Sequence, residues 1–242
     1  MHVYTQQVRR YGMIAIYILS ALSIILGTLS GFFNLRISPT RRIFTKGLAS
    51  LLFIAVALIA IYIKGASLYA VLVIGALILG AVGDLYLCLN ANIALKEKTA
   101  NLFLIGGASF FAGHVLFSIV YIACVPFPLY LIPCVFILPA LLGVALLVGK
   151  KKISLGKLTP FAFAYGIILN LMLVVTINAF AHNYNNTFGI LSLIAGVLFA
   201  ISDGALFFKE FSHLKGNPVL IYIVLVTYYV AQCLFACTIL FY

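Results

Sequence analysis

Eight long apolar runs, separated by short polar segments, dominate the pattern of this chain. They cover residues 11–33, 43–63, 68–90, 102–124, 127–149, 158–180, 187–208 and 218–241. A helix needs about 20 apolar residues to cross a hydrocarbon core about 30 Å thick, and each run meets that length. The pattern predicts an all-α, multi-pass transmembrane bundle of about eight helices, with residues 1–242 forming a single integral membrane domain.

The weakest boundary is the segment 125–128, which separates the fourth run from the fifth and contains Pro126 and Pro128. Prolines here are compatible with a tight turn between two spans or with a kink inside longer helices. Seven or nine spans therefore remain open as alternatives to eight.

Composition supports a membrane protein and changes how the net charge is interpreted. Hydrophobic residues make up 65% of the chain and charged residues only 8%, whereas a soluble domain carries about 25% charged residues. A net charge of +11 would suggest a nucleic-acid partner in a soluble protein. Here the lysines and arginines cluster between the apolar runs, as membrane-flanking anchors do. We therefore expect the lipid bilayer, and not nucleic acid, as the partner.

The basic residues also predict an orientation. One side of the membrane receives Arg9, Arg10 and Lys64, whereas the loops on the other side receive the remaining twelve basic residues. The positive-inside tendency places those loops in the cytoplasm and both termini outside it. The first run is too long for a signal-peptide core. We expect a cell membrane location in a bacterium and an endoplasmic reticulum membrane location in a eukaryote.

Two of the four acidic residues, Asp84 and Asp203, lie inside apolar runs. A carboxylate at the centre of a membrane helix costs about 2.5 to 3.5 kcal/mol on the insertion scale, and ionisable residues at such positions are usually functional. Helix packing alone gives no reason for the protein to bear this insertion free energy at two positions. We therefore interpret both aspartates as candidate catalytic residues.

The surroundings of the two aspartates suggest an internal repeat. Each follows a small residue and is followed three positions later by leucine; His114 comes 30 residues after Asp84, and Gln232 comes 29 residues after Asp203. We infer a parallel duplication of four helices, related by an axis along the membrane normal. Such a repeat would bring both carboxylates to a similar depth around one central cavity. Both would lie in the cytoplasmic half of the membrane.

Further polar residues lie at compatible depth and are expected to bind substrate or support the aspartates. They are Lys46, His114, Tyr165, Asn170, Tyr229 and Gln232. A zinc hydrolase of the ceramidase kind would need about three histidines near the metal, but His114 is the only histidine in an apolar run. No C-x-x-C pair occurs. We predict neither a metal nor another cofactor.

These residues also carry a family resemblance. Gly83-Asp84, the Phe/Gly-rich lead into His114, Tyr165 with Met172, Ser202-Asp203, and Tyr229 with Gln232 occur in this order. The series, from Lys46 to the C-terminus, resembles the YhhN/TMEM86 family of lysoplasmalogenase-like membrane proteins.

The resemblance implies hydrolysis of the vinyl ether bond of lysoplasmalogens, with a lysophospholipid as substrate and two intramembrane aspartates as acid and base. One aspartate, kept neutral by apolar surroundings, would donate a proton. The other, kept ionised by hydrogen bonds, would stabilise the cation and orient water. Lys46 and the basic loops would hold the lipid phosphate.

The sequence also allows three other interpretations. A proton-coupled transporter of small molecules or lipids would also bury acids in a bundle built from repeats. An intramembrane aspartyl protease is weakly indicated, because Ala81 replaces the first glycine of its Gly-x-Gly-Asp pattern and the Pro-Ala-Leu triplet at 139–141 falls between the aspartates. A structural scaffold leaves the two aspartates without a role.

Overall fold

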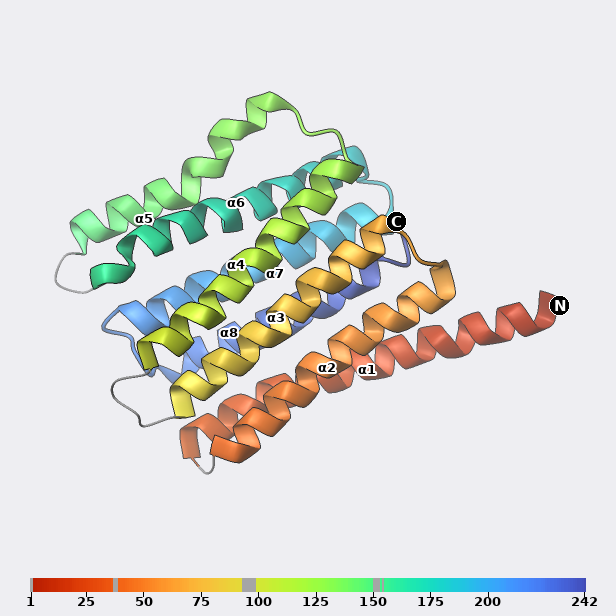
Figure 1. Ribbon diagram of the computed structural model, residues 1–242. Helices are drawn as coiled ribbons and strands as arrows, with labels where there is room; N and C mark the ends of the chain where they lie inside the picture. Colours follow the sequence, from red (N-terminus) through yellow and green to blue (C-terminus); the bar gives the residue numbers. More distant parts are fainter. Residues whose placement is uncertain (1, 37–38, 93–98, 150–152, 154) are drawn as a thin grey trace.

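The computed structural model describes residues 2–36, 39–92, 99–149, 153 and 155–242 and has an all-α architecture (Figure 1). Its helices are α1 (His2–Arg36), α2 (Pro39–Lys64), α3 (Leu68–Asn92), α4 (Thr99–Cys124), α5 (Ile137–Val148), α6 (Thr159–His182), α7 (Thr187–Phe211) and α8 (Pro218–Thr238), with short 3-10 helices η1 (Leu129–Phe136) and η2 (Gly156–Leu158). Eight helical segments within the described residues are long and apolar enough to cross a membrane, which confirms the predicted fold class.

The predicted span over 127–149 is confirmed at Leu129–Val148, but its first part is not an α-helix. η1 occupies Leu129–Phe136, and the α-helix that follows has only 12 residues. Proline has no N–H to donate, and Pro133 lies inside η1. At a rise of 1.5 Å per residue, α5 alone reaches about 18 Å, so the fifth span needs both segments. The segment 125–128 is a break between α4 and η1, which leaves eight spans.

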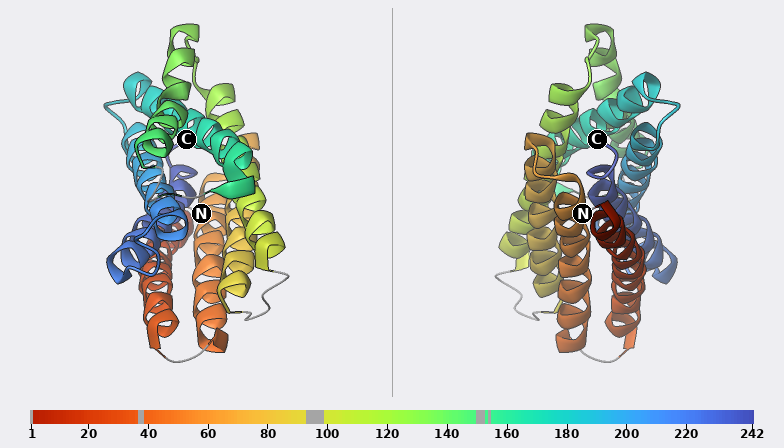
Figure 2. Two further views of the ribbon diagram at one scale, coloured as in Figure 1. Left: turned by 90° about the vertical axis from the view of Figure 1, so that its left-hand side faces the viewer. Right: turned by 90° about the vertical axis from the view of Figure 1, so that its right-hand side faces the viewer.

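The order of packed neighbours repeats along the chain. In the first half, α2 packs on α3 and α3 on α4; in the second, α6 packs on α7 and α7 on α8. The halves meet where α4 packs on α6 and where α8 packs on α1, α2 and α3. Figures 1 and 2 show α1 flanking one edge of the bundle and α5 the other. A parallel repeat of four helices would give this packing order, and the repeat stays a prediction.

The two edges differ in one respect. α1 packs on α8 as well as on α2, whereas α5 packs on η1 and α6 and, within the described part of the chain, makes no matching contact with α4. The second half is therefore more open at its outer edge than the first.

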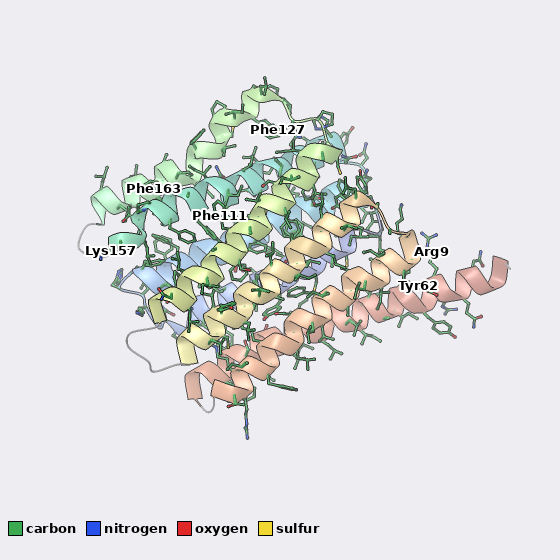
Figure 3. All side chains as sticks on the ribbon, in the orientation of Figure 1. Arg9, Tyr62, Phe111, Phe127, Lys157 and Phe163 are labelled. Atoms are coloured by element: carbon green, nitrogen blue, oxygen red, sulfur yellow. The ribbon has the colours of Figure 1, made fainter. Side chains whose placement is uncertain are left out.

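The outer surface of the bundle is apolar, and polar side chains gather inside it. Leu58, Tyr62, Ile78 and Val148 are exposed, while Asp84 is buried. Apolar exposure on this scale is rare in soluble monomers, and the chain is an integral multi-pass membrane protein. Figure 3 shows Lys157 at one end of the bundle and Arg9 at the other. The predicted loop charges at 96–98 and 150–152 lie outside the described residues.

Candidate active site in the bundle interior

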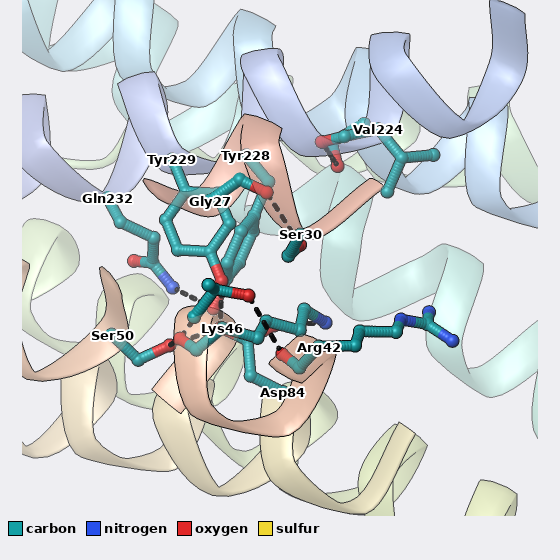
Figure 4. A network of polar contacts seen from close by, with 12 residues as sticks. Gly27, Ser30, Arg42, Lys46, Ser50, Asp84, Val224, Tyr228, Tyr229 and Gln232 are labelled. Atoms are coloured by element: carbon teal, nitrogen blue, oxygen red, sulfur yellow. Dashed lines mark hydrogen bonds and ion pairs between the residues drawn. The ribbon is translucent and has the colours of Figure 1, made fainter. Parts of the chain in front are cut away.

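Asp84 of α3 lies in a buried cluster that occupies both oxygens of its carboxylate. The Nζ atom of Lys46 lies 2.7 Å from Oδ1, and the hydroxyl of Ser50 donates to Oδ2 at 2.7 Å. The phenol of Tyr229 donates to the same Oδ2 at 3.4 Å (Figure 4). The side chains of Lys46 and Asp84 are 10% and 3% exposed. An ion pair this deeply buried persists only where such further hydrogen bonds satisfy the carboxylate.

Helix geometry explains how this cluster forms. Lys46 and Ser50 are four residues apart on α2, so they lie on the same helix face. Tyr229 reaches them from α8, in a space that Gly27 of α1 leaves open. A methyl group at Gly27 would overlap the tyrosine ring. Side chains of α2 and α8 therefore meet at the carboxylate of α3, although α8 is far from both in the sequence.

Asp203 of α7 lies in a second cluster with different chemistry. The phenol of Tyr165 donates to Oδ2 at 2.7 Å, and Nε2 of His114 lies 3.0 Å from the same oxygen. Nε2 is also 3.1 Å from the Tyr165 hydroxyl, and Nδ1 of His114 lies 3.2 Å from the sulfur of Met172. Within the described residues, no partner contacts Oδ1 of Asp203. The carboxyl is therefore held through one oxygen, and its other oxygen is available to a ligand.

Both aspartates line one cavity of about 530 Å³. This volume is within the range of small-molecule sites. Arg42, Lys209 and Lys215 contribute positive charge to its lining. Lys209 is paired with Glu210 at 2.6 Å. The cavity therefore joins a cationic region to the two buried carboxyl groups.

A smaller, mostly apolar cavity of about 90 Å³ adjoins the first. Both are lined by Asp203 and by Leu87, Phe103, Phe110, Leu158, Leu206 and Phe211, and the smaller one extends to Gly107, Phe161, Ala162, Tyr165 and Phe207. We call this smaller cavity the apolar arm. Asp84 lines only the larger cavity, so Asp203 is the aspartate that borders both.

The structure brings six of the eight residues predicted from sequence to the two aspartate clusters. Asp84 is joined by Lys46 and Tyr229, and Asp203 is joined by His114 and Tyr165.

The other two predicted residues make different contacts. Gln232 donates to the Tyr228 hydroxyl at 2.9 Å, and its buried carbonyl oxygen has no partner within the described residues. The amide of Asn170 donates at 2.6 Å to the carbonyl of Cys134 in η1. The expected support of the site by Asn170 is therefore indirect, because its hydrogen bond holds the proline-broken segment.

Sequence reasoning did not select Ser50 of the Asp84 cluster. Ser50 lies one turn after Lys46, and this i, i+4 spacing was the available signal. Tyr228 lines the cavity and packs edge-on against Phe110 and Phe199. Among the described residues, no three His, Cys, Asp or Glu side chains are grouped as metal ligands would be.

Comparison with known proteins gives one match. Residues 41–239 match the model of the YhhN family, a range that contains every side chain of both aspartate clusters. Searches of curated proteins and of solved structures found no match.

Proposed function

Since this chain belongs to the YhhN family, which includes lysoplasmalogenases, we propose that it hydrolyses the vinyl ether bond of lysoplasmalogens. The products are a fatty aldehyde and a glycerophospho-alcohol. The observation that carries this proposal is that two carboxyl groups with contrasting partners line one cavity. Paired acid groups of unlike protonation suit a reaction that passes through an oxocarbenium ion.

We assign proton donation to Asp203 together with His114. Hydrolysis of an enol ether begins with proton transfer to the carbon distant from oxygen, which leaves an oxocarbenium ion. The Nε2 atom of His114 lies 3.0 Å from Oδ2 of Asp203, so the imidazole can exchange a proton with the carboxyl group. Tyr165 fixes the carboxyl orientation through Oδ2, which leaves Oδ1 as the oxygen that would pass a proton to the substrate.

We assign the fixed negative charge to Asp84. The ammonium of Lys46 and the hydroxyl groups of Ser50 and Tyr229 favour the ionised carboxylate. This charge stabilises the oxocarbenium ion and orients the water that attacks it. The water proton passes to the Asp203–His114 pair, which restores its starting state. The resulting hemiacetal then breaks its bond to the glycerol oxygen, and that oxygen gains the hemiacetal hydroxyl proton.

The basic residues at one end of the cavity indicate from which side of the membrane the substrate would enter. Arg42, Lys209 and Lys215 lie on the side that carries most of the basic residues. The positive-inside tendency places this side in the cytoplasm. The cavity would then take its substrate from the cytoplasmic leaflet.

The deciding experiment is aldehyde release from a lysoplasmalogen by the purified, detergent-solubilised protein. We expect aldehyde from the wild type and none from Asp84→Asn or Asp203→Asn, with all three eluting as folded protein in size-exclusion chromatography. Aldehyde from both variants at the wild-type rate would contradict the proposal. A proton-coupled transporter would instead move the lysolipid across a vesicle membrane unchanged and release no aldehyde.

A further inference from the structure

The end of the bundle at which Lys64 lies is filled by packed side chains. α2 ends there at Lys64 and α3 begins there at Leu68, whereas Lys215 lines the larger cavity toward the opposite end. Two layers of buried side chains lie between the Lys64 end and the aspartates. Among the described residues that line the larger cavity and the apolar arm, none belongs to either layer.

The first layer is aromatic and covers His114. The ring of Phe199 lies 4.7 Å from the imidazole of His114, measured between centroids. Phe117 stacks on Phe235 with ring centroids 4.2 Å apart, and Phe199 lies 6.4 Å from Phe235. We call Phe117, Phe199 and Phe235 the aromatic layer, and all three are buried. Rings packed at these separations leave no room for water between them.

A second layer, which we call the hydroxyl cluster, lies beyond the aromatic layer. It takes one side chain from each of α3, α4, α7 and α8, namely Tyr69, Tyr121, Ser192 and Thr238. The hydroxyl oxygens of Tyr69 and Thr238 are 2.7 Å apart, and Tyr121 donates to Ser192 at 2.8 Å. Tyr69 joins the two pairs by donating to Tyr121 at 3.4 Å. Buried hydroxyl groups need hydrogen-bond partners, and each of these four finds one inside the cluster.

The shortest contacts in both layers join the first half of the bundle to the second. Tyr69 of α3 pairs with Thr238 of α8, and Tyr121 of α4 pairs with Ser192 of α7. The ring stack of the aromatic layer likewise joins α4 to α8. Alternating access moves one half of a transporter against the other. Such a movement at this end would break both hydrogen bonds and leave buried hydroxyl groups without partners.

We propose that the Lys64 end stays closed while the protein works, so that water and polar solutes reach Asp84 and Asp203 only from the end that carries Lys215. A transporter must open its site to both sides of the membrane in turn, whereas a hydrolase needs one opening. The closure therefore favours a reaction over transport. This inference goes beyond the proposed function, because it concerns access to the site and does not depend on which bond is broken.

Thiol modification from each side of the membrane tests the closure without relying on hydrolysis. Leu206 lines both cavities, and Leu206→Cys in otherwise cysteine-free protein places a reactive group there. Lys64→Cys and Lys215→Cys identify the side of the membrane on which each end of the bundle lies. A charged, membrane-impermeant methanethiosulfonate reagent is added to one side of sealed vesicles at a time. The measurement is repeated with lysoplasmalogen present, because an alternating-access protein opens its other end during turnover.

We expect the reagent to modify Leu206→Cys only from the side on which it modifies Lys215→Cys, with and without the lipid. Modification from the Lys64 side, or from neither side, would overturn the inference. Val224 also lines the larger cavity, so Val224→Cys serves for the same measurement if Leu206→Cys does not fold.

The residues that form the closure are tested by opening it. Phe117→Ala/Tyr121→Ala removes one α4 side chain from each layer, and Phe208→Ala makes the first of these changes on the exposed surface of α7. With the cavity cysteine present, we expect the double variant to be modified from both sides and Phe208→Ala from one side only. One-sided modification of the double variant would overturn the assignment of the closure to these layers. Phe235→Ala, a single change in the same ring stack, should also give two-sided modification and replaces the double variant if that does not fold.

Discussion

Lys46 and Tyr165 occupy equivalent places in the two halves of the bundle, because each lies 38 residues before an intramembrane aspartate and contacts its carboxyl group at 2.7 Å. Lys46 is on α2 and Tyr165 on α6, the helices that correspond in a repeat of four. The inferred repeat would make these two contacts equivalent, with different chemistry in each half.

Each aspartate is also contacted by a side chain from the opposite half of the bundle. Tyr229 of α8 contacts Asp84 of α3, and His114 of α4 contacts Asp203 of α7. Each carboxyl group is therefore held by both halves at once. The matching positions carry an ammonium in one half and a phenol in the other, and on this difference we base the two proposed roles of the acids.

Replacing Lys46 tests the buried ion pair. Lys46→Met removes the cation and leaves the Asp84 carboxylate buried among hydroxyl groups alone. We expect the free energy of unfolding to fall by about 3–5 kcal/mol, because an unpaired buried charge loses its compensation. Thermal unfolding in detergent measures this change.

The double variant Lys46→Met/Asp84→Asn provides the control for that prediction. With no charge left to pair, we expect most of the lost stability to return while aldehyde release stays absent. Equal instability in the single and double variants would show that Lys46 acts through packing and not through its charge.

Removing one hydroxyl group tests the orientation of Asp203. Tyr165→Phe keeps the ring and deletes the donor that lies 2.7 Å from Oδ2. Hydrogen bonds to charged groups contribute about 1.5–3 kcal/mol, so we expect kcat to fall by roughly ten- to a hundredfold. Tyr130→Phe makes the same atomic change on the exposed surface of η1 and should leave kcat unchanged. A normal kcat in Tyr165→Phe would remove this tyrosine from the reaction.

Removing the ring nitrogens of His114 tests its part in proton donation. His114→Phe keeps an aromatic ring and deletes the nitrogen that lies 3.0 Å from Oδ2 of Asp203. Because we assign proton donation to this pair, we expect kcat for aldehyde release to fall. The check is aldehyde release by the wild type and the variant at one fixed pH. A normal kcat would remove His114 from the reaction.

The fold was largely predictable because the bilayer limits the alternatives. Eight runs of sufficient length had to become spans, and the structure has them. The exception was 127–149, where hydropathy alone could not reveal that η1 is a 3-10 helix. The choice between α and 3-10 geometry there depends on Pro133, which lacks an N–H, and on tertiary hydrogen bonds from α6. An average of hydropathy over a window records neither.

The candidate site was predictable in its residues but not in its pairing. Asp84 and His114 are near in sequence, yet His114 contacts Asp203. The cost of burying polar groups in a membrane identifies such residues, but it does not say which helices meet. Ser50 was missed because serine is common in membrane helices and gives little signal by itself.

The orientation of the bundle is testable from its two ends. Lys64 lies at the end of α2 on the predicted outer side, and Lys215 lies on the predicted cytoplasmic side. In otherwise cysteine-free protein, we expect Lys64→Cys to react with a membrane-impermeant maleimide in intact cells. Lys215→Cys should react only after the membrane is permeabilised, and the reverse pattern would invert the topology.

Replacing Asn170 tests whether this residue supports the fold or the reaction. Its amide donates to the carbonyl of Cys134 at 2.6 Å, and the amide of Asn178, two turns later on α6, donates to the carbonyl of Pro126 at 2.8 Å. Together they bind backbone groups of the proline-broken segment, which lipid cannot satisfy. We expect Asn170→Ala to lower the free energy of unfolding by about 1–3 kcal/mol. The kcat of the folded fraction should match the wild type, and a selective loss of kcat at normal stability would return Asn170 to the catalytic site.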